Sequence, residues 1–380
     1  MNSPICKMLG IDFPLLAFSH CRDVVAAVSK AGGMGVFGAV NLPPDRLGEE
    51  LDWIDKHAGG KPWGVDLIVP NKMAGKSEPF SADALLSAVP QRHKDFATGI
   101  LKQHGIEPGD LDSDRSNSVD FARNMRADGA ASSLEVAFQY PIKLIANALG
   151  VPPPIMLDLG KKFGVPVAAL VGAKEHAVAQ VQAGVDILVV AGGEAGGHCG
   201  EVSTMVLVPE VARAVRKMGA NTAILAAGGI TTGTQMAGAM AMGADGAWCG
   251  SVWLTTTEAE TNPVVKQKML AASSRDTVRS RSRTGKPSRQ LRSPWTDAWE
   301  QENAPDPLPM PLQTLVSEPA LRRIDKLSQS GHAGAQQLAT YWVGQGVGLM
   351  EQSMSAGQVV QQFKEDFAAA YERLAGAMEA

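Results

Sequence analysis

The chain has 380 residues, of which 45% are hydrophobic and 19% are charged, and its net charge at pH 7 is −4. A chain of this length can bury one large core or two moderate cores, and its slightly acidic balance does not suggest a nucleic-acid partner. The four cysteines have no CxxC spacing, which argues against a zinc site and favours reduced thiols. The first residues do not resemble a signal peptide and no apolar run is long enough to span a membrane, so we expect a cytoplasmic protein without a membrane partner.

The first part of the chain alternates between strands and helices. Apolar runs predict strands at 13–18, 34–39 and 63–69. A helix that Asp23 can cap is expected between the first two strands, and a second helix, opened by a pair of prolines, is expected at 44–57. This βαβαβ order predicts a parallel sheet.

The alternation stops after Val69. Residues 71–135 are polar, have a helical character and contain no convincing strand. An excursion of this length at the carboxyl end of a strand is more typical of a lid or cap than of a simple connection. An insertion without a function is the alternative.

The strand–helix order resumes after the insertion. The next strand is expected at 142–146, with 134–138 as a competing choice. Further strands are expected at 165–171, 186–190, 222–227 and 246–250, separated by helices that include 175–183, 206–218 and 234–242. Eight strands with helices between them predict an α/β fold, a (β/α)8 TIM barrel with a helical insertion after strand three, rather than an open doubly wound sheet.

The pattern changes after residue 260. Residues 275–292 carry seven Lys and Arg residues opposed only by Asp276, which predicts either a solvated face or a site for the phosphates of a CoA thioester or pyridine nucleotide. An amphipathic helix is expected at about 355–378. We therefore expect a barrel at 1–260 that carries the insertion, a smaller C-terminal substrate or lid domain at 261–340, and a return to the barrel at 341–380.

A glycine-rich loop directly follows the strand at 186–190. Residues 191–200 contain five glycines together with Glu194 and His198. Glycine lets the backbone approach a ligand closely, and His198 is the side chain best suited to proton transfer near neutral pH. Because barrels keep their active sites at the carboxyl ends of strands, this loop is a candidate active site. A loop that needs glycine only for its turns is the alternative.

Glycines also follow the last two predicted strands, at Gly228–Gly229 and at Gly250, where Ser251 adds a hydroxyl group. In a barrel, the loops after strands seven and eight commonly bind phosphate through backbone N–H groups. A phosphate site beside a glycine-rich loop indicates a phosphorylated planar cofactor across the barrel mouth, and FMN is the obvious candidate. Tight turns between barrel units are the alternative.

Several motifs together resemble the nitronate monooxygenase family, formerly called 2-nitropropane dioxygenases, whose flavin-dependent enoyl-ACP reductase relatives share some of them. The motif EAGGHxG is specific to this flavoprotein group but does not separate its branches. The resemblance covers most of the chain outside 71–135. The motifs are EAGGHCG at 194–200, AGGI at 227–230, GADG at 243–246, GS at 250–251, RTGKPSRQLR at 283–292 and GQG at 344–346.

The resemblance implies an FMN-bearing barrel with a smaller C-terminal domain that closes over the cofactor. His198 matches the histidine that acts as general base in nitronate oxidation. No metal site is implied. The residues that we expect to bind FMN are Asp66, Gly196, Gly197, Gly228, Gly229, Gly250, Ser251, Gln345 and Gly346.

The chain departs from the family pattern around the flavin ring. Asp66 replaces an asparagine that usually bonds the ring, and both Ala191 and Trp248 stand where glutamine is usual. The first strand ends in Ala-Phe-Ser-His20 instead of an APM-type sequence. We predict His20 as a second catalytic acid or base, and a histidine bonded only to backbone is the alternative. FMN binding is therefore a firmer expectation than the nitronate reaction.

The leading hypothesis is an FMN enzyme that oxidises alkyl nitronates with O2, with His198 as general base and a small-molecule substrate. The alternative is an NAD(P)H-dependent FMN reductase acting on an enoyl thioester or quinone. A flavin-binding protein without turnover is a third hypothesis. A monomer and a homodimer are both open, and the sequence does not identify the physiological substrate.

Overall fold

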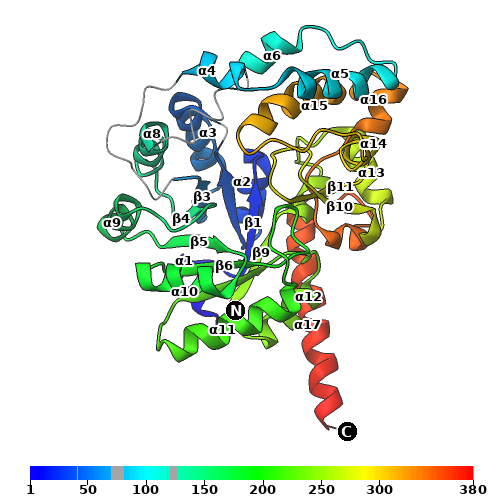
Figure 1. The fold of residues 1–380 in the computed structure, drawn as a ribbon. Coiled ribbons are helices and arrows are strands. Elements are labelled where there is room, and N and C mark those ends of the chain that lie inside the picture. Colours follow the sequence, from blue (N-terminus) through cyan, green and yellow to red (C-terminus); the bar gives the residue numbers. More distant parts are fainter. Residues whose placement is uncertain (41, 70–80, 118, 120–126, 380) are drawn as a thin grey trace.

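The computed structural model describes residues 1–380 except 41, 70–80, 118, 120–126 and 380 (Figure 1). Eight parallel strands close into a barrel, in which each strand pairs with its neighbours along the chain and the last pairs with the first. The predicted (β/α)8 barrel is therefore confirmed. The barrel strands are β1 (Leu15–Ser19), β2 (Met34–Gly38), β3 (Trp63–Leu67), β4 (Leu144–Asn147), β5 (Val167–Val171), β6 (Ile187–Ala191), β8 (Ala223–Ala227) and β9 (Gly246–Cys249).

Side chains along each barrel strand alternate between two cores. On β3, Val65 and Leu67 pack outward among the surrounding helices, whereas on β2 Met34 and Val36 fill the barrel interior. A short helix, α1 (Pro4–Leu9), contributes Ile5 and other apolar side chains to the interior core. The period of two explains why continuous apolar runs, buried on both faces, were good predictors of strands here.

Helices surround the barrel between the strands (Figure 1). The competing strand at 134–138 is wrong, because Leu134 and Ala137, three residues apart, lie on one buried face of α8, and the chain reaches β4 only after Pro141. The surrounding helices are α2 (Arg22–Lys30), α3 (Pro44–His57), α8 (Ala127–Ala137), α9 (Pro154–Phe163), α10 (Lys174–Ala183), α11 (Thr204–Lys217), α12 (Gly233–Ala241) and α17 (Ala356–Glu379).

The insertion and the segment after residue 260 share a second hydrophobic core. Ile100 and Leu101 of the insertion pack in one cluster with Leu315 and Ile324. None of the helices in the described ranges is long and apolar enough to cross a membrane. The domain boundaries expected at 260 and 340 stay predictions. The helices around this core are α4 (Ala82–Ser87), α5 (Gln91–Gln103), α6 (Leu111–Asn117), α13 (Pro263–Ala271), α14 (Pro294–Ala298), α15 (Leu312–Gln329) and α16 (Ala333–Leu338).

A small antiparallel sheet joins the barrel to the second core. Its strands are β7 (Gly197–His198), β11 (Ser288–Leu291) and β10 (Thr277–Ser280), and β11 lies between the other two. The basic run at 275–292 forms this sheet, and most of its guanidinium groups have protein partners. Arg281, Arg283 and Arg292 form ion pairs with Asp306, Glu318 and Asp297, and Arg289 donates to the Gly193 carbonyl.

Candidate active site

Contacts with the start of α11 fix the conformation of the loop after β6. The Glu194 carboxylate accepts hydrogen bonds from the Thr204 N–H (2.9 Å) and the Thr204 hydroxyl (3.0 Å). A negative charge at a helix N-terminus is favourable, so Glu194 has a structural role. A Cβ added at Gly192 would lie 2.2 Å from the Thr204 hydroxyl oxygen, so this position requires glycine. The loop then leaves the barrel and leads to β7, which carries His198.

His198 is positioned by the small sheet. It lies on β7 opposite Ser288, and its Nε2 is 2.8 Å from the hydroxyl of buried Thr284. The same hydroxyl lies 3.3 Å from the Lys286 carbonyl oxygen. When Thr284 donates to that carbonyl, its oxygen accepts from His198 Nε2–H, and His198 Nδ1 is left free to take a proton.

The environment of His198 favours the neutral imidazole. Its pKa is lowered, first by desolvation and second by the positive charge of Lys286. The side chain is nevertheless exposed to water and is not part of the core. A neutral and accessible imidazole can act as a base at neutral pH.

A rigid aromatic wall stands beside His198. The Trp342 ring centroid is 6.3 Å from that of His198, and the Arg283 guanidinium lies 4.3 Å from the centroid of the Trp342 ring. Arg283 is 7% exposed and its Nε donates to Glu318 at 2.8 Å. Because the guanidinium is held by an ion pair and by a ring face, the wall has little freedom to move.

A glycine cradle, defined here as Gly228–Ile230 and Gly250–Ser251, follows β8 and β9. Gly228 and Gly229 have φ values of +98° and +72°, which L side chains rarely adopt. Within the described residues, the N–H groups of Gly229, Ile230 and Ser251 donate to no protein acceptor. Unpaired backbone donors beside glycines fit a phosphate group.

The C-terminal segment around η3 (Gln345–Leu349) locks against the cradle. The Gly344 N–H donates to Ser251 Oγ (2.8 Å), which leaves the Ser251 proton available to a ligand, and the Gln345 N–H donates to the Glu194 carbonyl (2.9 Å). A Cβ at Gly346 would lie 2.6 Å from the Gly229 carbonyl oxygen. These contacts join loops that are more than ninety residues apart in sequence.

His20 lies at the barrel mouth just after β1, the strand that pairs with β2 and β9. Its Nδ1 is 2.6 Å from the Gly38 carbonyl oxygen, so Nδ1 carries the proton and Nε2 is unprotonated in the neutral ring. Burial lowers the pKa of His20, and the backbone hydrogen bond opposes this only in part. The backbone bond expected in the alternative interpretation is present, but Nε2 is still available as a base.

Asp66 lies inside the barrel, near the carboxyl end of β3. It is 1% exposed, and its Oδ1 has no hydrogen-bond partner in the described part of the molecule. Burial alone raises its pKa to about 8. An unsatisfied buried carboxyl oxygen is costly, so this position fits a ligand that can complete its hydrogen bonds.

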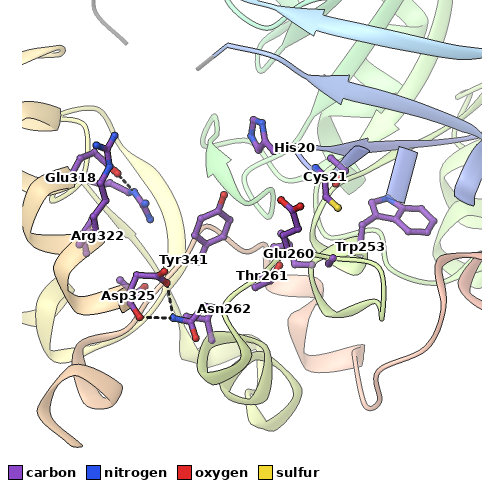
Figure 2. A pocket seen from close by; sticks show the side chains of 17 residues that line it. His20, Cys21, Trp253, Glu260, Thr261, Asn262, Glu318, Arg322, Asp325 and Tyr341 are labelled. Atoms are coloured by element: carbon purple, nitrogen blue, oxygen red, sulfur yellow. Dashed lines mark hydrogen bonds and ion pairs between the residues drawn. The ribbon is translucent and has the colours of Figure 1, made fainter. Parts of the chain in front are cut away.

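A cavity of about 370 Å³ lies between the barrel mouth and α15 (Figure 2). His20 borders it on the barrel side, Glu318 and Arg322 border it on α15, and Tyr341 points into it from between. No protein partner is found for the Tyr341 hydroxyl or the Arg322 guanidinium among the residues that the structure describes. His198 does not border this cavity, whereas Arg283, which packs on Trp342 beside His198, does.

The structure thus brings Gly196, Gly228, Gly229, Gly250, Ser251, Gln345 and Gly346 together on one side of the barrel mouth. Gly197 and His198 project from β7, and His20 and Asp66 belong to the β1–β3 side. Sequence reasoning missed Thr284, Arg283 and Trp342 as neighbours of His198. Thr284 and Arg283 stand in the motif RTGKPSRQLR, which was the only signal available for them.

Sequence comparisons agree with this geometry. A family model described as nitronate monooxygenase matches residues 3–366. A protein of Mycobacterium tuberculosis, provisionally named a monooxygenase, is 52% identical over 369 residues, which cover 97% of this chain and 96% of that protein. A Staphylococcus saprophyticus protein, provisionally named a nitronate monooxygenase, is 24% identical, over 95% of this chain and 96% of that protein.

Solved structures share the fold along the whole chain. Nitroalkane oxidase from Streptomyces ansochromogenes has a TM-score of 0.78 and 23% identity, with 97% of this chain and 99% of that chain covered. FabK from Thermotoga maritima has a TM-score of 0.71 and 25% identity, with 99% of each chain covered. The similarity therefore includes the second core as well as the barrel.

Proposed function

The chain belongs to the nitronate monooxygenase family of flavin-dependent oxidoreductases, and from that premise we propose that it uses FMN to oxidise alkyl nitronates with O2. The observation that carries the proposal is His198, a neutral and accessible imidazole that a buried threonine orients beside a phosphate-type cradle. FMN, when bound, accepts electrons from the substrate and passes them to O2.

The residues proposed to hold FMN divide between backbone and side chains. The N–H groups of Gly229, Ile230 and Ser251 would bind the phosphate, since they have no protein acceptor in the described ranges. Gly196, Gly344 and Gly346 allow the backbone segments of the cradle to lie in contact, and Gly197 leaves open space beside His198. Asp66 and Gln345 would contact the cofactor from the barrel and from the C-terminal segment.

His198 has one of two tasks, which depend on the form of the substrate. When a neutral nitroalkane enters, the unprotonated His198 nitrogen takes the α-proton, and the electron pair of the broken C–H bond remains as the nitronate. When the nitronate itself enters, its negative charge favours the imidazolium form of His198, whose Nδ1–H then orients the nitronate by a hydrogen bond. Trp342 and Arg283 limit the space on this side.

Oxygen consumption tests this proposal. The full chain, loaded with FMN, should consume O2 with propyl-2-nitronate in the absence of any pyridine nucleotide, and the chain without FMN should not. No oxygen uptake with alkyl nitronates of several chain lengths would contradict it. The four cysteines are free, which fits a reducing compartment such as the cytoplasm.

The second candidate function is an NAD(P)H-dependent reduction of a larger acceptor, and the cavity of Figure 2 favours it. A volume of about 370 Å³ is far more than an alkyl nitronate of five or six heavy atoms needs, since one water molecule occupies about 30 Å³ in the liquid. His20 Nε2 and the Tyr341 hydroxyl would contact such a substrate. Rapid bleaching of the flavin by NADH or NADPH would select this function.

A further inference from the structure

Asp66 stands out among the inward-facing residues of the barrel strands. Val65 and Leu67 face the helices outside, so Asp66 faces inward, in register with Gly38 of β2 and Ala146 of β4. The other inward-facing side chains of the described barrel strands are apolar or glycine. An ionisable group at such a position requires a physical explanation.

Among the residues that the structure describes, no charged group compensates the Asp66 carboxyl. The register neighbours on β2 and β4 carry no titratable side chain, and the helices α2 and α8 pack on the outer face of β3. His20 reaches this layer from the end of β1, but its Nδ1 proton is donated to the Gly38 carbonyl. Desolvation therefore acts alone on Asp66 and raises its pKa to about 8.

We propose that Asp66 binds the pyrimidine edge of the flavin as a neutral carboxylic acid. The inference rests on the proposed use of FMN. That edge is an imide, in which an N–H group lies between two carbonyl groups. A neutral carboxyl matches it with two hydrogen bonds, because its carbonyl oxygen accepts from the imide N–H and its O–H donates to a flavin carbonyl.

The ionised form of Asp66 would be a poor match for the imide edge of the flavin. A carboxylate accepts from the imide N–H but repels the carbonyl oxygens on either side of it. The single unpartnered Oδ1 atom and the absence of a neighbouring cation in the described structure both fit the neutral form. Affinity for FMN should therefore fall as the pH rises through the pKa of Asp66, and Asp66→Asn should abolish this dependence.

FMN titrations of the flavin-free full chain test the inference. We expect the dissociation constant of the wild type, divided by that of Asp66→Asn, to rise about tenfold between pH 7 and pH 9, because the neutral fraction falls about tenfold. The ratio cancels the titration of FMN itself. Asp245→Asn is the matched control, since Asp245 bonds to the Ile224 N–H at the opposite end of the barrel. Its pH dependence should equal that of the wild type.

Infrared spectroscopy gives a second measurement that needs no activity. The wild type at pH 7 should show the C=O stretch of a protonated carboxyl that disappears above pH 9 and is absent from Asp66→Asn. If that variant does not fold, the wild-type titration decides alone. FMN binding with a constant ratio and no such band overturns the inference and leaves the proposed function standing, whereas no FMN binding at any pH overturns the proposed function.

Discussion

Two regions of the barrel mouth are built on different principles. The glycine cradle after β8 and β9 offers backbone N–H groups, whose positions depend only on main-chain conformation. The reaction side, by which we mean His198, His20, Asp66 and the wall of Trp342 and Arg283, offers side chains. His198, His20 and Arg283 are each held by a partner, whereas Asp66 Oδ1 has none among the described residues. A substitution on the reaction side should therefore act through one side chain, whereas a substitution in the cradle should act through the backbone.

Replacing His198 should give the largest effect and leave the cradle intact. We expect His198→Asn to lower kcat with a neutral nitroalkane by about 10²–10⁴-fold, because the proton acceptor is lost. The dissociation constant for FMN should not change. The neighbouring Cys199→Ser is the control, since its thiol lies against the Gly193 carbonyl and has no proposed role. An unchanged rate in His198→Asn would remove this residue from the mechanism.

Breaking the ion pair between Arg283 and Glu318 should destabilise the folded protein. Glu318→Leu leaves the buried Arg283 guanidinium without its carboxylate, which we expect to lower the free energy of unfolding by about 3–5 kcal/mol. Denaturant unfolding measures this loss. The double variant with Arg283→Leu should recover part of it, because no buried charge then remains. Equal stability of Glu318→Leu and wild type would show that the pair is not needed.

A substitution in the cradle should weaken FMN binding and leave turnover per bound FMN almost unchanged. Gly346→Ala places a Cβ 2.6 Å from the Gly229 carbonyl oxygen, and we expect FMN affinity to fall about 10–100-fold as the segments separate. Turnover per bound FMN should stay close to that of the wild type. Gly238→Ala on α12, where an added Cβ meets no atom within 4 Å, is the control and should bind FMN normally. Normal FMN affinity in Gly346→Ala would argue against the cradle as the phosphate site.

The smallest predicted effect is a shift in the pH profile of kcat. Because the pKa of His198 is lowered, the base should stay active through neutral pH and lose activity only as the pH falls through that lowered value. Lys286→Gln removes one cause of the lowering, so the loss should begin at a higher pH. The rate at pH 8 should change by less than about twofold, since Lys286 is exposed. A pH profile of kcat that does not move would assign the shift to desolvation alone.

The two regions also differ in how well the sequence predicted them. The barrel and the cradle were predictable because local signals define them: apolar runs mark the strands, and glycine doublets mark the strand ends. The strands β7, β10 and β11 were not predicted, since they are short and polar, and β7 pairs with β11 across about ninety residues. Arg283 and Glu318 are 35 residues apart, and no local pattern identifies them as partners.

The packing partners of the insertion could not be predicted from the sequence either. Its helical character was predicted, but its packing against α15 depends on apolar side chains more than two hundred residues away. The expectation that 275–292 forms a solvated face agrees with the exposure of Arg275, Arg281, Lys286 and Arg292 but not with the burial of Arg283. Each guanidinium of that run looks exposed in sequence, and only the fold reveals that Arg283 and Arg289 are partly or fully covered. The roles of Gly197, His20 and Asp66 remain predictions, and Asp66→Asn tests the last of them.

The most direct test of the proposed function is an anaerobic spectrum of the FMN-loaded protein, to which propyl-2-nitronate, NADH and NADPH are added separately. We predict that the nitronate alone bleaches the flavin absorbance within the time of one turnover, and that admission of O2 restores it. Bleaching by NADH or NADPH, with no response to the nitronate, would contradict the proposed function and select the reductase.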